Sequence, residues 1–113
     1  MVSYSYYTST YKGNSIPESE WGSYEQRAQF KLARYKRIYN VTAPGEHSED
    51  NAVCSMADTM YFYDAAANGY TSRQIGSVSS SNNQIDLSER AQNISIYRAA
   101  SEHVDIYRGA SNA

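Results

Sequence analysis

The sequence predicts a mainly α-helical fold, a small bundle of three main helices at about residues 17–39, 48–68 and 87–105. Two observations lead to this class. In each segment large side chains recur at steps of three and four residues, which is the period of one helix face. Each segment also opens with acidic residues, which favour the first turn of a helix. All 113 residues are expected in one domain, with an extended arm at 1–15 and a tail at 106–113.

The first helix has the clearest start signal. Pro17 suits the first helical position, where a missing N–H costs nothing, and Glu18 and Glu20 suit the positive end of the helix dipole. One face of this helix is predicted to be buried. Its side chains are Trp21, Tyr24, Ala28, Leu32, Tyr35 and Tyr39.

The second helix is expected to begin at Ser48, a plausible N-cap followed by Glu49 and Asp50. Gly69 is expected to end it, because glycine favours the position after a helix. The side chains predicted to share one face are Val53, Met56, Ala57, Met60, Tyr61 and Asp64.

A polar segment near residues 73–86 separates this helix from the third. Ile75 and Val78 lie among glycine and serine, with Asn82-Asn83 suited to a turn, so a weak strand or hairpin is predicted.

The third helix is expected to open with a capping box in "DLSE", residues 86–89, with aspartate in place of serine or threonine. The side chains predicted to face one way are Leu87, Ala91, Ile94, Tyr97 and Val104.

Nothing in the sequence indicates an enzyme or a cofactor. His47 and His103 are the only histidines, and neither has a sequence neighbour that completes a catalytic or metal-binding motif. Cys54 lies among apolar residues, so we expect a buried, unreactive thiol. The expected sites are therefore binding surfaces, with no metal and no cofactor.

Charge and hydropathy favour a protein made in the cytoplasm, with no membrane contact and no hydrophobic signal sequence. No apolar run approaches the roughly 20 residues that span a bilayer, and a single cysteine fits a reducing compartment. Residues 1–45 carry six basic and three acidic groups, whereas residues 46–113 carry four basic and nine acidic ones. One end of a molecule could therefore attract the other end of a neighbour.

Several large apolar side chains fall outside the predicted stripes. Phe30 lies about 160° around its helix from the stripe, and Phe62 lies almost opposite Val53. Ile96 and Tyr107 also fall outside the arc of the third helix. Such residues pack either in a second layer of the chain's own core or against copies of the same chain. The tyrosines of the arm predicted to join the contacts between subunits are Tyr4, Tyr6, Tyr7 and Tyr11.

The first helix also carries a strip of cations at Arg27, Lys31 and Arg34, with Arg37 close by. Three interpretations stay open at this stage. The strip is a solvated face, an ion-pairing surface for an acidic neighbour, or a track along nucleic-acid phosphates.

The chain resembles the small head–tail connector, or adaptor, proteins of tailed bacteriophages and prophages. The resemblance runs in order through "YYTSTYKGNSIPESEW", "YEQRA" and "RI" of the first 38 residues and "AVCSMADTMYFYD" at 52–64. It continues through "IGSVS" at 75–79 and "IYRG" at 106–109, so that it spans nearly the whole chain.

This resemblance implies a ring, most simply twelve-fold, below the portal of the capsid. Such a ring extends the DNA channel and joins the head to the stopper or tail, which places the chain in the virion neck. Ile75, Val78 and Arg108 are then candidates for docking to the portal or tail, and the cation strip for facing the channel or pairing with acids. Packaged DNA would pass without specific binding. The alternatives are a small helical phage or bacterial regulator that binds nucleic acid and, less well supported, a partner protein of the toxin–antitoxin type.

Overall fold

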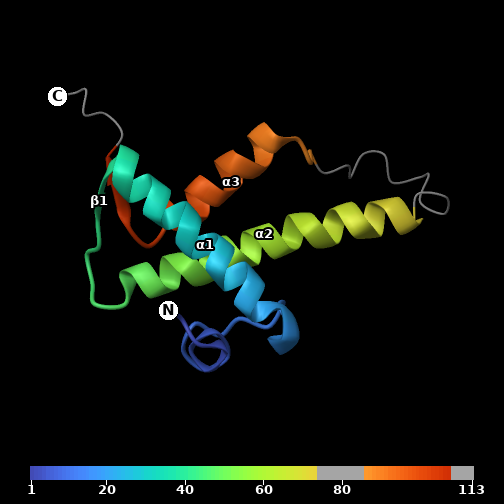
Figure 1. Cartoon of the computed structure of the whole chain (residues 1–113), viewed down its shortest axis with the longest axis horizontal. Coiled ribbons are helices and arrows are strands. Elements are labelled where there is room, and N and C mark those ends of the chain that lie inside the picture. The colour runs from blue at the N-terminus through green and yellow to red at the C-terminus, as the bar shows by residue number, and fades with distance from the viewer. Residues whose placement is uncertain (74–85, 108–113) are drawn as a thin grey trace.

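The computed structural model describes residues 1–73 and 86–107, and it confirms a mainly helical fold with three long helices (Figure 1). The long helices are α1 (Glu18–Ile38), α2 (Ser48–Arg73) and α3 (Glu89–Ser101). Helix α1 crosses over α2, and α3 packs against α2 as well. The core therefore lies around the first half of α2.

Helix α1 buries the predicted stripe except for Tyr39, which caps the C-terminal end of the helix and is half-buried. Pro17 has an extended backbone and immediately precedes the helix, one position earlier than expected. Tyr24 meets the ring of Tyr61 edge-on at 5.3 Å, and its hydroxyl donates to Asp64 Oδ2 at 2.6 Å. The predicted side chains that are buried on α1 are Trp21, Tyr24, Ala28, Leu32 and Tyr35.

Helix α2 passes through Gly69 and ends at Arg73, so the predicted stop was wrong. One glycine costs a helix about 1 kcal/mol relative to alanine, too little to end a long cooperative helix. Ser48 is the first helical residue rather than the N-cap, and its Oγ accepts the N–H of Gly45 at 2.9 Å. The helix is buried all round between residues 52 and 57.

Helix α3 is shorter than predicted and turns a different face inward. Its N-cap is Ser88, whose Oγ accepts the N–H of Ala91 at 3.1 Å, while Asp86 accepts the N–H of Ser88 at 3.0 Å. Ile94 lies on the exposed side, contrary to the expected face. The residues of α3 that are buried are Ile96, Ala99 and Ala100.

A two-stranded antiparallel sheet joins β1 (Asn40–Thr42) to β2 (Asp105–Tyr107). The sequence analysis did not predict it, and residues 106–107, expected in the tail, belong to β2. Val41 pairs with Ile106 at the centre, and both pack against the core. The sheet therefore ties the ends of α1 and α3 together. Of the strand or hairpin predicted near 73–86, all but the two end residues lies outside the described residues.

The extended N-terminal arm was also a wrong prediction, because this segment is folded onto the core. Residues Tyr6–Thr10 form one short π-helix, and Tyr7 is fully buried with its ring stacked on Trp21 at 4.5 Å. The Tyr7 hydroxyl donates to Asp58 at 2.6 Å and accepts the N–H groups of Ser15 and Ile16 at 3.1 Å each. A tyrosine whose hydroxyl is satisfied in this way can be buried at little polar cost.

A second set of hydrogen bonds holds the first residues to α1. The Trp21 indole donates to the carbonyl of Val2 at 3.0 Å. The N–H of Val2 donates at 2.9 Å to the buried carboxylate of Glu25, which also accepts from Gln29 at 2.8 Å. The segment is thus part of the globule rather than a free arm.

Candidate interaction surfaces

Among the side chains that the structure describes, three aromatic ones are more than half exposed. Phe30 is 65% exposed, Phe62 is 52% exposed and Tyr107 is 71% exposed. Their exposure agrees with their positions outside the predicted stripes, and their part in subunit contacts stays a prediction. Ile38 and Ile94 are exposed too, and the sequence analysis did not single out either as a surface residue.

Two other residues proposed for subunit contacts lie in the core instead. Ile96 is only 6% exposed, because the buried face of α3 is rotated from the predicted one. Tyr7 is fully buried, as described above. Neither side chain can reach a neighbouring subunit while the chain stays folded.

The remaining tyrosines of the N-terminal segment serve mainly their own chain. The Tyr4 hydroxyl donates to the carbonyl of Ile16 at 2.9 Å, and the Tyr6 hydroxyl donates to Asn51 at 2.7 Å. Tyr11 stacks on the ring of Tyr7 at 6.1 Å. These side chains are half-buried, so only their outer edges are available to a partner.

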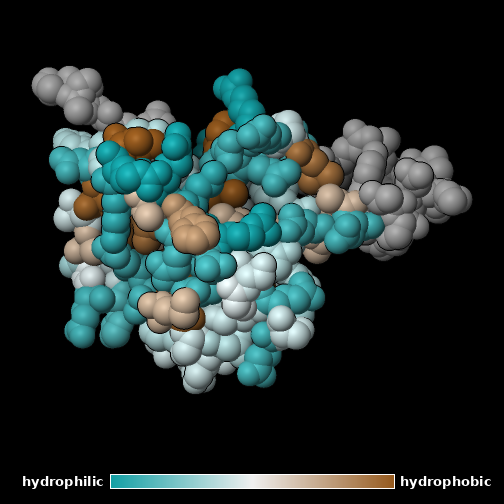
Figure 2. Space-filling view, viewed as in Figure 1, coloured by the Kyte–Doolittle hydropathy of each residue, from teal (hydrophilic) through white to brown (hydrophobic). Residues whose placement is uncertain are grey.

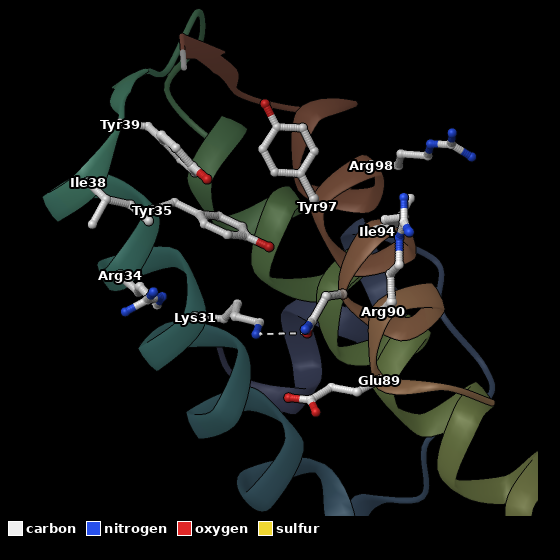
Figure 3. Close-up of a pocket in the computed structure, with 11 residues that line it drawn as sticks. Lys31, Arg34, Tyr35, Ile38, Tyr39, Glu89, Arg90, Ile94, Tyr97 and Arg98 are labelled. Atoms are coloured by element: carbon white, nitrogen blue, oxygen red, sulfur yellow. Dashed lines mark hydrogen bonds between the residues drawn. The ribbon is translucent and has the colours of Figure 1, made fainter. Parts of the chain in front are cut away.

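A groove with a volume of about 860 Å³ lies between α1 and α3 and is called here the α1–α3 groove. Figure 3 shows Lys31 and Tyr35 reaching from α1 toward the side chains of α3. The groove is lined by Lys31, Arg34, Tyr35, Ile38, Tyr39, Glu89, Arg90, Asn93, Ile94, Tyr97 and Arg98.

Positive charge dominates this groove, which contains four cations and one carboxylate, Glu89. Lys31 Nζ donates to Asn93 Oδ1 at 3.2 Å, and within the described part of the chain no ion pair joins Arg34, Arg90 or Arg98 to an acid. The groove can therefore accept several negative charges from outside.

The predicted cation strip on α1 is only partly available. Arg27 pairs with Asp64 at 3.1 Å and lies over the ring of Tyr24 at 5.0 Å, so its charge is largely compensated. Lys31 and Arg34 line the groove, and both also line an adjoining hollow that includes Arg37. Phe30 borders the same hollow. Figure 2 shows apolar side chains, in brown and tan, set among hydrophilic ones on this face.

Tyrosines close the far wall of the groove. Tyr97 meets Tyr35 edge-on at 5.6 Å and Tyr39 edge-on at 6.2 Å. Burial, followed by the neighbouring Tyr39 and Tyr97, raises the pKa of Tyr35 to about 12. Tyr35 is therefore neutral at physiological pH, and the charge of the groove comes from its four cations and Glu89.

No group of three or more His, Cys, Asp or Glu side chains in 1–73 and 86–107 is placed to hold a metal ion. Over the same residues, no helix combines the length and the apolar character needed to cross a bilayer.

Cys54 is buried, as expected, and burial raises the pKa of its thiol to about 12, with Asp58 and Asp50 adding to the shift. Only the thiolate is nucleophilic, so near pH 8 alkylation of the folded chain should be about a thousandfold slower than alkylation of the unfolded chain. Mass spectrometry after iodoacetamide treatment, with and without denaturant, measures the ratio. Equal rates would show that Cys54 is accessible.

The three residues predicted to dock to a portal or tail, Ile75, Val78 and Arg108, lie outside the described residues. Their role stays a prediction. No protein-family model, curated protein or solved structure matches the chain.

Proposed function

We propose that this protein is a non-catalytic structural protein of a phage virion, a head–tail connector subunit that forms a ring below the portal. The observation that carries the proposal is the exposure of Phe30 and Phe62 on a small single domain. A large apolar side chain left in water forgoes about 1.5–3 kcal/mol of burial, which a contact with another subunit recovers. The resemblance of the sequence to connector proteins supplies the kind of assembly.

In this proposal each subunit contacts the next through two different surfaces, so that the contact repeats around a ring until it closes. The exposed aromatics lie on different elements, with Phe30 on α1, Phe62 on α2 and Tyr107 on β2, which suits such a contact. The ring takes the symmetry of the portal, most simply twelve-fold, extends the DNA channel and joins the capsid to the stopper or tail. Its place is the virion neck, after synthesis in the host cytoplasm.

Native mass spectrometry of the purified chain mixed with purified portal rings tests this function. We expect complexes in which each portal ring carries one ring of this chain. Portal rings that stay free at micromolar concentrations of both proteins would contradict the proposal. A permanent component of the virion must bind the portal more tightly than that.

One observation favours a second candidate, a small helical module that binds nucleic acid. The α1–α3 groove gathers Lys31, Arg34, Arg90 and Arg98 beside three tyrosines. Lysine and arginine neutralise phosphates, and the release of counterions makes such binding strongly dependent on salt.

We expect no sequence-specific binding of duplex DNA, because the net charge of −2 opposes it and no recognition-helix motif is present. Gel-shift assays with unrelated duplexes should show only weak binding that is equal for all sequences and disappears as salt increases. Tight, sequence-dependent binding at physiological salt would favour the regulator over the connector.

A further inference from the structure

The cations of the α1–α3 groove face away from the densest acidic part of the chain. This acidic end of α2 is defined as Glu46, which precedes the helix, with Glu49 and Asp50 in its first turn. Glu49 pairs with Lys36 of α1 at 2.7 Å, which places this end beside Lys36. Lys36 lies about 200° around α1 from Arg34, which lines the groove. The acidic end and the groove are thus on opposite sides of α1, and one chain cannot pair them with each other.

Both surfaces keep charge available for a partner. At the acidic end, Lys36 pairs with Glu49 at 2.7 Å and His47 approaches Asp50 at 3.8 Å, while no ion pair is formed by Glu46 within the described residues. Glu46 is exposed, and Glu49 and Asp50 are half-buried. On the other side, Arg34, Arg90 and Arg98 have no carboxylate partner among the described residues.

We infer that the α1–α3 groove of one subunit binds the acidic end of α2 of a second copy of the same chain. The inference rests on the proposed self-assembly and names the surfaces that meet. Arginine guanidinium groups suit carboxylates because they donate two parallel hydrogen bonds. The exposed Ile38 and Ile94 in the groove add apolar surface that the contact covers.

A contact of this kind leads to a closed ring or a growing chain of subunits rather than to a dimer. The groove and the acidic end are different surfaces, so each copy still offers one of them after pairing through the other. Charge complementarity between the two surfaces speeds association and disfavours contacts that bring like charges together. It should also make self-association weaken as salt increases.

A charge-swap experiment on the full chain tests the inference. In the groove variant, Arg34→Glu and Arg90→Glu make the groove acidic. In the end variant, Glu46→Lys and Asp50→Lys make the acidic end basic. The control variant, Glu18→Lys with Glu20→Lys, makes the same change in net charge as the end variant, at exposed residues in the first turn of α1.

Sedimentation velocity should show that the wild type and the control variant self-associate, and that each swapped variant alone does so at least about 100-fold more weakly. An equal mixture of the two swapped variants should assemble again, with the variants in a 1:1 ratio, because each groove then meets an end of opposite charge. Circular dichroism checks that all variants keep their helices.

Three results would overturn the inference. The first is a wild type that stays monomeric up to about 1 mM at low salt. The second is a pair of swapped variants that assemble like the wild type, or a mixture that does not recover assembly. The third is a wild type that does not self-associate but shifts a DNA probe, with the shift lost in the groove variant. The portal assay above tests the connector role separately, since the chain can assemble through this contact without binding a portal.

Discussion

Replacing Tyr7 with alanine should lower the free energy of unfolding by about 3–5 kcal/mol, the range for large aromatic side chains removed from a core. Tyr7 is fully buried, stacks on Trp21 and contacts Tyr11. Its ring also lies where a side chain at Gly13 would overlap it, so the segment is built closely around this ring. Urea unfolding followed by circular dichroism measures the change.

Tyr7→Phe separates the hydroxyl from the ring. Loss of the hydroxyl leaves Asp58 and two backbone N–H groups without that partner, and we expect a cost of about 1–3 kcal/mol. Tyr107→Ala is the control, since that ring is mostly exposed and its removal should cost little. If Tyr7→Ala costs no more than Tyr107→Ala, the N-terminal segment is not part of the core.

Phe30→Ser and Phe62→Ser should leave the monomer folded and abolish its assembly. Each side chain is more than half exposed, so the isolated chain loses little burial. At a subunit contact the same change forfeits about 1.5–3 kcal/mol, and a ring repeats this loss at every interface. Particles carrying either variant should lack the connector and leak DNA or fail to join tails.

Leu32→Ser is the matched control for Phe30→Ser, because Leu32 lies on the buried face of the same helix. We expect this change to unfold the monomer, whereas Phe30→Ser should unfold with the same midpoint as the wild type. If Phe62→Ser unfolds the isolated chain, then Phe62 serves the chain's own fold and is not an interface residue.

The sequence predicted α1 well because its signals are local. Pro17, two glutamates and a stripe from Trp21 to Tyr35 all lie within the helix or next to it, and together they determine its start and its buried face. The exposure of Phe30 and Phe62 followed from the same periodicity. The three-helix class was predictable for this reason.

The parts that were missed depend on distant partners. Tyr7 is buried because Trp21 and Asp58 receive its ring and hydroxyl, and no pattern within residues 1–15 reveals those partners. The sheet pairs residues 65 positions apart at Val41 and Ile106, where each strand is only three residues long. Such short strands carry too few residues for a clear alternation.

In the α1–α3 groove, too, the sequence revealed the residues that follow a local pattern and missed those that depend on packing. Lys31 and Arg34 were singled out because they recur along one helix. Arg90 and Arg98 were not, because only the packing of α3 beside α1 brings them to the same groove. The buried face of α3 differs from the predicted one, because the helix starts at Glu89 and turns Ile96 inward, and this orientation places Arg90 and Arg98 along the groove.

The most direct test of the connector role is electron microscopy of portal-bearing capsids mixed with the purified chain. The proposal predicts an added ring of density below the portal, with the symmetry of the portal, that is absent when Phe30→Ser replaces the wild type. Capsids whose portals stay bare with the wild-type chain would contradict it.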